Sequence, residues 1–257
     1  EIKNIRNADK DKEVAIFYRT NSQSRLFEEE LRNLDLNYKL VGSVGFYERK
    51  EIKDIVSYLQ FLVNDNDIAA FERIVNEPKR GIGQTTLKKI REYMNENGCS
   101  IQEALESLYN FKNLSNRVIS NLLEFKDLIN ELKTYALQGP SKAIEKTLEL
   151  TGYKLNLIKD GTLESQNRIE NLDELLTSAF NYENLYDDEA DEPYAKLRDY
   201  LDSISLFSET DNLEESDKIL LMTLHNAKGL EFPYVFITGM EENLFPHERS
   251  SQGDQSE

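Results

Sequence analysis

The chain has 257 residues, of which 39% are hydrophobic and 31% charged, and its formal net charge is −17. This composition is typical of a globular protein, and no run approaches the roughly 20 apolar residues that a membrane-spanning helix needs. A single cysteine, Cys99, excludes an internal disulfide framework and a thiolate metal cluster within these residues. The charged first residues lack both a Met and an apolar signal core, so we expect a segment of a longer cytoplasmic protein.

The charge is unevenly distributed. Residues 183–217 hold thirteen Asp or Glu against Lys196 and Arg198, whereas five basic residues and no acidic one lie between Lys79 and Arg91. Phosphate binding needs Lys and Arg on the contacting face rather than a positive total, so the acidic average does not exclude a nucleic-acid partner. The acidic stretch is interpreted as a solvated connecting segment.

The first predicted elements form a β-α-β unit. Residues 14–18 and 38–41 are short runs rich in strand formers. Between them, four apolar positions share one helical face: Leu26, Phe27, Leu31 and Leu34. Such a unit predicts a parallel sheet with functional loops at the carboxyl ends of its strands.

After residue 48 the apolar spacing becomes helical until strand signals return at 218–223 and 234–238. Helices are predicted at 49–63, 67–75, 84–97, 100–109, 115–136, 141–151, 164–182 and 191–207. Many aromatic side chains have core spacing and are interpreted as packing residues rather than base-stacking platforms, for example Phe61, Phe71, Phe125 and Phe180. This order predicts an α/β domain, residues 1–50 and 217–257, interrupted by an all-helical insertion at 51–216.

Several catalytic signatures are missing from the sequence. There is no G-x-x-x-x-G-K-[ST] phosphate loop and no G-x-G-x-x-G, so these residues hold no complete nucleotide site. His225 and His247 are the only histidines, which leaves zinc catalysis unsupported. No Ser-His-Asp or Cys-His arrangement indicates a hydrolytic nucleophile.

Four segments in the same order resemble the PcrA/UvrD/Rep family of superfamily 1 DNA helicases, most closely its PcrA branch. They are residues 18–31, 46–54, 78–83 and 222–233, the last continued by 239–247. The resemblance implies an incomplete RecA-like parallel-sheet motor domain, the second of the family's two, with a large all-α inserted domain. It also implies ATP-dependent 3′–5′ unwinding with ATP and Mg²⁺ as cofactors, on single-stranded and duplex DNA.

The segment at 78–83 has two glycines that permit close backbone approach, and the helix predicted after it presents free N–H groups suited to a phosphate. It resembles a helix-hairpin-helix element that grips duplex DNA without reading sequence. The candidate contacts are Lys79, Arg80, Gly81, Gly83 and Thr85. An ordinary tight turn followed by a solvated basic helix is the alternative.

The segment at 222–233 leaves the sheet at the edge where ligands bind in α/β domains. By resemblance, Thr223 and His225 would face single-stranded DNA, while Gly229 and Glu231 would approach the nucleotide. Glu231 would accept a hydrogen bond from the ribose hydroxyl, and Lys228 would orient the loop or neutralise charge. A surface histidine without a role is the alternative for His225.

Three further residues are candidates for the same DNA track. Arg19 and Asn21 follow the first strand, and His247 follows Phe245-Pro246. A structural ion pair is the alternative for Arg19. Gly45 stands where the family often has a basic residue, so no DNA contact is expected there.

The resulting hypothesis is a part of a helicase motor that has no ATPase activity alone. A regulatory module that docks proteins or duplex DNA is the alternative, as is a subunit of a helicase-nuclease. The sequence leaves the pathway open among repair, replication and control of recombination.

Overall fold

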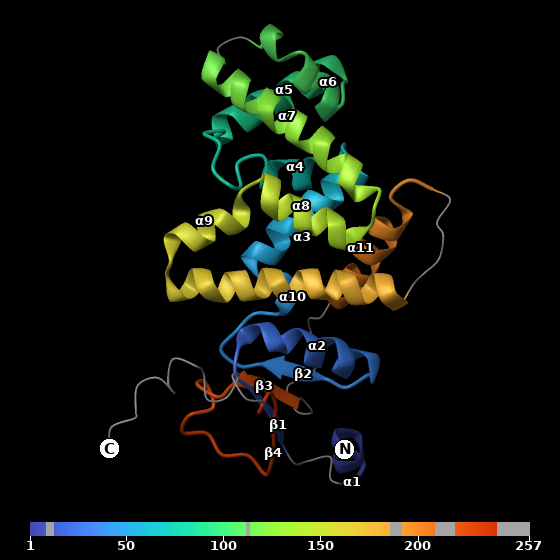
Figure 1. Cartoon of the computed structure of the whole chain (residues 1–257), viewed down its shortest axis with the longest axis vertical. Coiled ribbons are helices and arrows are strands. Elements are labelled where there is room, and N and C mark those ends of the chain that lie inside the picture. The colour runs from blue at the N-terminus through green and yellow to red at the C-terminus, as the bar shows by residue number, and fades with distance from the viewer. Residues whose placement is uncertain (9–12, 112–113, 186–191, 209–218, 241–257) are drawn as a thin grey trace. The chain divides into compact units, whose positions relative to one another are not determined.

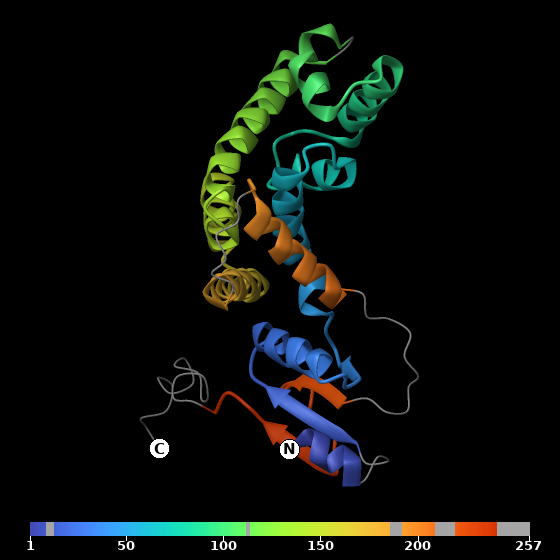
Figure 2. The ribbon, with the colours of Figure 1, turned by 90° about the vertical axis from the view of Figure 1, so that its right-hand side faces the viewer.

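The computed structural model describes residues 1–8, 13–111, 114–185, 192–208 and 219–240. The chain has a mixed α/β fold and divides into two compact units (Figures 1 and 2). The sheet unit comprises Glu1–Arg49 with Phe207–Glu257, and the helical unit comprises Lys50–Leu206. Among the described residues, no helix is both long and apolar enough to cross a membrane.

The sheet unit is built on four parallel strands in the order β2-β3-β1-β4. Their bounds are β1 Val14–Tyr18, β2 Tyr38–Leu40, β3 Ile219–Thr223 and β4 Tyr234–Ile237. Ala15 of β1 aligns with Leu220 on one side and Val235 on the other. The parallel sheet predicted from the β-α-β pattern is confirmed, and strands from both ends of the sequence alternate in it.

In the part of this unit that the structure describes, two helices and two short 3-10 turns accompany the sheet: α1 Ile2–Ala8, η1 Asn21–Gln23, α2 Ser24–Asn33 and η2 Phe46–Glu48. The predicted apolar face of α2 is only partly correct. Leu31 is buried in the core with Ile16 and Leu221, but Leu26 is 55% exposed and Leu34 39%. The reason is that α2 also buries polar residues, including Glu28, for a hydrogen-bond network described below.

The helical unit contains nine α-helices and one 3-10 turn in its described residues. They are α3 Lys50–Val63, α4 Ile68–Ile74, α5 Gln84–Asn97, α6 Ile101–Glu106, η3 Leu108–Asn110, α7 Asn116–Ala136, α8 Pro140–Leu150, α9 Tyr153–Asp160, α10 Leu163–Leu185 and α11 Ala195–Ser208. Sequence reasoning missed α9, as it did α1 in the sheet unit. The helix predicted at 100–109 is interrupted at Ser107, and η3 begins at the next residue.

Aromatic packing forms the centre of the helical unit. Phe61, Phe71 and Phe125 are each at most 3% exposed, and their ring centroids lie 5.7 to 6.4 Å apart. These contacts confirm the core positions predicted for the three residues. Phe180 is 59% exposed, so the prediction that it packs in the core is wrong. It lies on α10, which buries a different face through residues such as Leu172 and Leu175.

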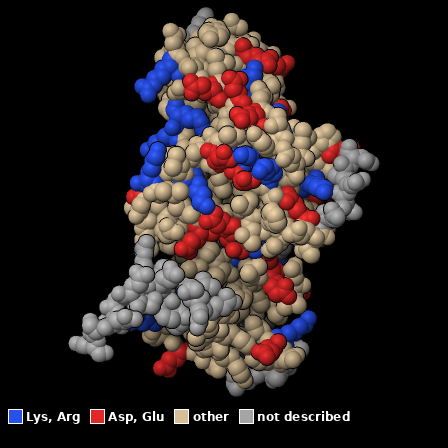
Figure 3. All heavy atoms as spheres, in the orientation of Figure 1, with Lys and Arg blue, Asp and Glu red and all other residues tan. Residues whose placement is uncertain are grey.

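Basic side chains gather along one edge of the helical unit. Figure 3 shows this edge on the left, on the side where the loop before α5 and helix α9 lie in Figure 1. Lys79, Lys88 and Lys154 come from that loop, from α5 and from α9. Basic side chains thus gather locally on a chain that carries −17 as a whole.

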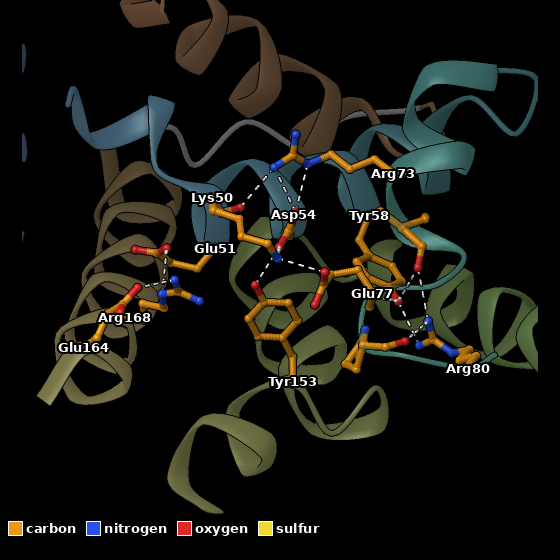
Figure 4. A network of polar contacts seen from close by, with 12 residues as sticks. Lys50, Glu51, Asp54, Tyr58, Arg73, Glu77, Arg80, Tyr153, Glu164 and Arg168 are labelled. Carbon is orange, nitrogen blue, oxygen red and sulfur yellow. Dashed lines mark hydrogen bonds and ion pairs between the residues drawn. The ribbon is translucent and has the colours of Figure 1, made fainter. Parts of the chain in front are cut away.

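A polar network fixes the first two turns of α3 (Figure 4). The Asp54 side chain is 3% exposed and accepts hydrogen bonds from Tyr153 Oη at 2.7 Å, Lys50 Nζ at 2.7 Å and Arg73 Nε at 2.9 Å. Burial raises the pKa of Tyr153, and the negative charge of Asp54 raises it further. Because Tyr153 begins α9 and Arg73 lies in the last turn of α4, a single carboxylate links three helices.

Candidate functional site

The loops that follow β1, β3 and β4 start side by side at the carboxyl edge of the sheet. The Leu224 N–H donates to the Tyr18 carbonyl at 2.9 Å, just past the ends of β3 and β1. Thr238 donates through its N–H and its Oγ1 to the Phe17 carbonyl, at 3.0 and 3.1 Å. Residues from both ends of the sequence therefore meet at one edge, where parallel α/β sheets bind ligands.

The four described residues predicted to face single-stranded DNA lie at this edge. Arg19 and His225 are exposed, and within the described part of the chain Arg19 makes no ion pair. Asn21 is half-buried, and its Oδ1 is buried with no hydrogen-bond partner in the described structure. Thr223 Oγ1 accepts the Asn226 N–H at 3.2 Å. The predicted contact His247 lies outside the described residues.

The loop after β1 is held in shape by Gln23. Its Oε1 accepts the N–H groups of Arg19 at 2.8 Å and Thr20 at 3.0 Å. Its Nε2 would lie 2.6 Å from a Cβ added to Gly239, the residue after Thr238, whose φ is +66°. Only glycine adopts this backbone without strain and leaves room for Gln23, so the loops after β1 and β4 pack closely together.

Asn226 joins the loops after β2 and β3. Its Nδ2 donates to the Val41 carbonyl at 3.1 Å, and a Cβ added to Gly42 would lie 2.5 Å from the same nitrogen. Gly42 has a φ of +74°, which favours glycine. Sequence reasoning missed Asn226 because its partner lies 185 residues away in the chain.

A largely buried network of hydrogen bonds holds the backbone of Asn21 in place. Arg49 Nη2 donates to the Asn21 carbonyl at 3.0 Å and to Ser24 Oγ at 2.7 Å. Ser24 Oγ donates in turn to Glu28 Oε1 at 2.7 Å, and Glu28 accepts the Phe46 N–H at 3.2 Å. Burial raises the pKa of Glu28, while these hydrogen bonds and Arg49 oppose the rise. Two of the family-like segments, 18–31 and 46–54, are therefore joined directly.

The segment between β3 and β4 begins with tight turns. The Ala227 N–H donates to the Thr223 carbonyl at 3.0 Å, and the Lys228 N–H donates to the His225 carbonyl at 3.4 Å. Gly229 has a φ of +86° and open space around its Cα, while Lys228 and Glu231 are exposed. The three residues predicted to approach a nucleotide thus lie beside His225 and are accessible to a ligand.

The glycine turn of the helical unit, residues 76–83, is organised around Asn76 and Arg80. Asn76 Oδ1 accepts the N–H groups of Arg80 at 2.8 Å and Ile82 at 3.0 Å. Arg80 Nη1 donates to the Ile74 and Pro78 carbonyls, at 3.1 and 3.2 Å, and its Nη2 donates to Tyr58 Oη at 2.9 Å (Figure 4). The guanidinium that was predicted to contact DNA thus points inward and holds the turn.

The remaining predicted residues of this turn are exposed: Lys79, Gly81, Gly83 and Thr85. Gly81 has a φ of +71°. Gly83 is the N-cap of α5 and offers no capping side chain, so no side chain satisfies the first N–H groups of the helix. Backbone donors and the Lys79 ammonium are therefore available to an anion, as the helix-hairpin-helix interpretation requires.

Comparison with known proteins gives two consistent results. A family model described as the UvrD-like helicase C-terminal domain matches residues 1–257. The chain is 40% identical over 256 residues to the ATP-dependent DNA helicase PcrA of Staphylococcus aureus strain MRSA252, covering 98% of this chain and 34% of that protein. It is 39% identical over 254 residues to the protein of the same name from Staphylococcus epidermidis, with the same coverage. The chain thus spans about a third of the length of these relatives.

Proposed function

The chain belongs to the UvrD-like helicase C-terminal domain family, and on that premise we propose that it is part of an ATP-dependent 3′–5′ DNA helicase. The sheet unit would be the RecA-like second motor domain, from residues 1–50 and 217–257, and the helical unit the domain inserted at 51–216. The alternation of early and late strands in one parallel sheet supports this assignment, because an insertion leaves the strands on its two sides to pair.

Lys228, Gly229 and Glu231 would form one side of the ATP site. Gly229 has room for the close approach of a ligand, and the exposed Glu231 carboxylate is an acceptor for a ribose hydroxyl. Bound ATP supplies the free energy of unwinding when its terminal phosphate is hydrolysed. In the whole helicase, ATP would act together with Mg²⁺.

Arg19, Asn21, Thr223 and His225 would form the single-stranded DNA track, continued by His247. The observation that carries the proposal is the position of His225 and Glu231 in one segment between β3 and β4, which starts with backbone hydrogen bonds to Thr223 and His225. A shift of this segment on nucleotide binding would move the DNA contacts with it. Its role would be coupling, while the P-loop that performs hydrolysis is absent from the sequence.

The glycine turn would hold duplex DNA through Lys79, Gly81, Gly83 and Thr85. Two exposed glycines let a phosphate approach the backbone, and Lys79 adds a charge-assisted contact. Arg80 would hold the turn in shape rather than contact DNA, because its guanidinium makes four hydrogen bonds within the helical unit. Such contacts fix the position of the backbone without reading bases.

Coupling is tested in the full-length parent protein. Glu231→Gln should raise KM for ATP with little change in affinity for single-stranded DNA, and His225→Ala should weaken DNA binding and the DNA-stimulated ATPase. Glu30→Gln, which alters an exposed carboxylate on α2, is the matched control. The proposal fails if Glu231→Gln behaves like the control, or if the purified 257-residue chain hydrolyses ATP by itself.

A docking module for protein partners is the second candidate for the helical unit. Apolar side chains on and beside α9 favour it, because Leu155, Ile158 and Leu163 are 52%, 56% and 76% exposed. Lys79→Glu separates the two functions: weaker duplex binding supports a DNA grip, and unchanged binding supports a protein-docking surface. A helicase-nuclease subunit would share these properties and differ in residues outside this chain.

A further inference from the structure

Helix α7 packs its first turns against the glycine turn. Asn121 Nδ2 donates to the Arg80 carbonyl at 2.5 Å, and a Cβ added to Gly81 would lie 3.6 Å from that nitrogen. Arg117 precedes Asn121 by four residues and so shares its face of the helix, about 6 Å away along the axis. The tertiary fold thus brings Arg117 beside a turn that lies far from it in the sequence.

The charges around this junction are mostly basic. Lys79 and Arg117 are exposed, and neither makes an ion pair with any residue that the structure describes. The Lys88 side chain on α5 is 77% exposed and lies 3.7 Å from Glu92. On the Arg117 face of α7, the next carboxylate is Glu124, which accepts a hydrogen bond from Ser120 Oγ at 3.1 Å. Lys79 is adjacent in sequence to Arg80, and Arg117 lies about one turn from Asn121, so an unpaired cation accompanies each partner of the contact between Asn121 and the Arg80 carbonyl.

We propose that Arg117 is a second phosphate contact for duplex DNA, which it binds together with Lys79 beside the glycine turn. The proposal rests on the proposed function of that turn and extends its surface to α7. An exposed guanidinium presents a planar fork of donors that matches two phosphate oxygens. Asn121 is a positioning residue, since its amide fixes α7 against the Arg80 carbonyl. Both cations would contact the DNA backbone and make binding independent of sequence.

Salt dependence of duplex binding provides the test. Each phosphate contact contributes roughly 0.9 to the slope of log K against log salt concentration for duplex DNA. We expect Arg117→Gln to weaken binding of a fluorescein-labelled duplex to the whole chain and to reduce the slope by about 0.9. Lys79→Gln should have the same effect, and the double variant should reduce the slope by about 1.8. Arg198→Gln, an exposed arginine of α11, is the matched control and should leave the slope unchanged.

The outcomes separate this inference from the proposed function. If the native chain does not bind duplex DNA, both fail. If Lys79→Gln reduces the slope and Arg117→Gln does not, only the role of Arg117 is overturned, and a protein-docking role for this part of α7 is then indicated. Arg117→Lys keeps the positive charge but loses the planar guanidinium donors, so it should keep the salt dependence and bind the duplex with reduced affinity. Circular dichroism of each variant verifies that the helices are intact.

Discussion

Replacing Asp54 by Ala removes the carboxylate that joins α3 to α4 and α9. The variant removes one acceptor shared by three donors, Tyr153 Oη, Lys50 Nζ and Arg73 Nε. Lys50 Nζ keeps its second partner, Glu77 Oε2, at 2.8 Å. Their environments differ, because the hydrogen bond from Tyr153 is buried, while the side chains of Lys50 and Arg73 are 49% and 35% exposed. Water can solvate the two cations in the variant, but the tyrosine hydroxyl stays inside the protein.

The expected loss of stability follows from these exposures. A buried hydroxyl left without a partner costs about 1 to 3 kcal/mol. Each half-exposed ion pair contributes less than about 1 kcal/mol, because solvent screens it. The sum is about 1 to 5 kcal/mol, which for a unit of this size corresponds to a fall in Tm of roughly 2 to 20 °C.

Thermal and urea unfolding, followed by helical circular dichroism, measure this loss. Asp173→Ala is the control, since Asp173 forms an exposed ion pair with Lys154 and should lose less than about 1 kcal/mol. Adding Tyr153→Phe to the Asp54→Ala variant should restore part of the stability by removing the unpaired hydroxyl. A fall in Tm for Asp54→Ala no larger than that of the control would refute the reasoning, as would a double variant less stable than Asp54→Ala.

Two further predictions concern the sheet unit. Burial raises the pKa of Glu28 above its ordinary 4.5. As the pH rises, Glu28 therefore ionises in the unfolded chain before it ionises in the folded chain. Its contribution to the free energy of unfolding falls between pH 4.5 and the higher pKa of the folded state. Glu28→Gln cannot ionise, so its stability relative to the native chain should improve as the pH rises above 4.5. Urea unfolding with pulse-labelling hydrogen exchange of α2 measures the difference, and a difference independent of pH would contradict this prediction. Gly42→Ala should destabilise the unit by about 1 to 3 kcal/mol through backbone strain and collision with Asn226. Gly229→Ala, also at positive φ but in open space, should lose only about 1 kcal/mol; equal exchange protection of β2 and β3 in the two variants would argue against the Asn226 contact.

The strands were predictable because each is a short apolar run bounded by polar or glycine residues. The runs at 14–18 and 234–238 agree with β1 and β4 to within one residue. Helix α9 was missed because it has no apolar face that a periodicity can reveal. Only Tyr153 is buried in it, Leu155 and Ile158 are exposed, and left-handed glycines stand at both ends. Contacts with neighbouring helices stabilise α9, rather than an amphipathic pattern in its own sequence.

The candidate site shows the same limit. Exposed residues at strand ends, such as Arg19 and His225, could be found from their position after an apolar run. The inward role of Arg80 could not, because it depends on Tyr58 and Phe125, which come from α3 and α7. A basic residue in a glycine-rich turn has the same sequence pattern whether its side chain meets solvent or the core. Tertiary packing decides between the two.

The strand order has a consequence for biosynthesis. β1 lies between β3 and β4, so both of its partners are translated after the helical unit. At about 5 to 20 residues per second, the ribosome needs roughly 10 to 40 s to reach β3 after completing β1. The helical unit is contiguous in the sequence and can fold within that interval. Until β3 and β4 are synthesised, however, the edges of β1 stay unpaired and its apolar side chains stay exposed. During synthesis, the unpaired β1 strand of the sheet unit is therefore the part of the chain that would most need chaperones.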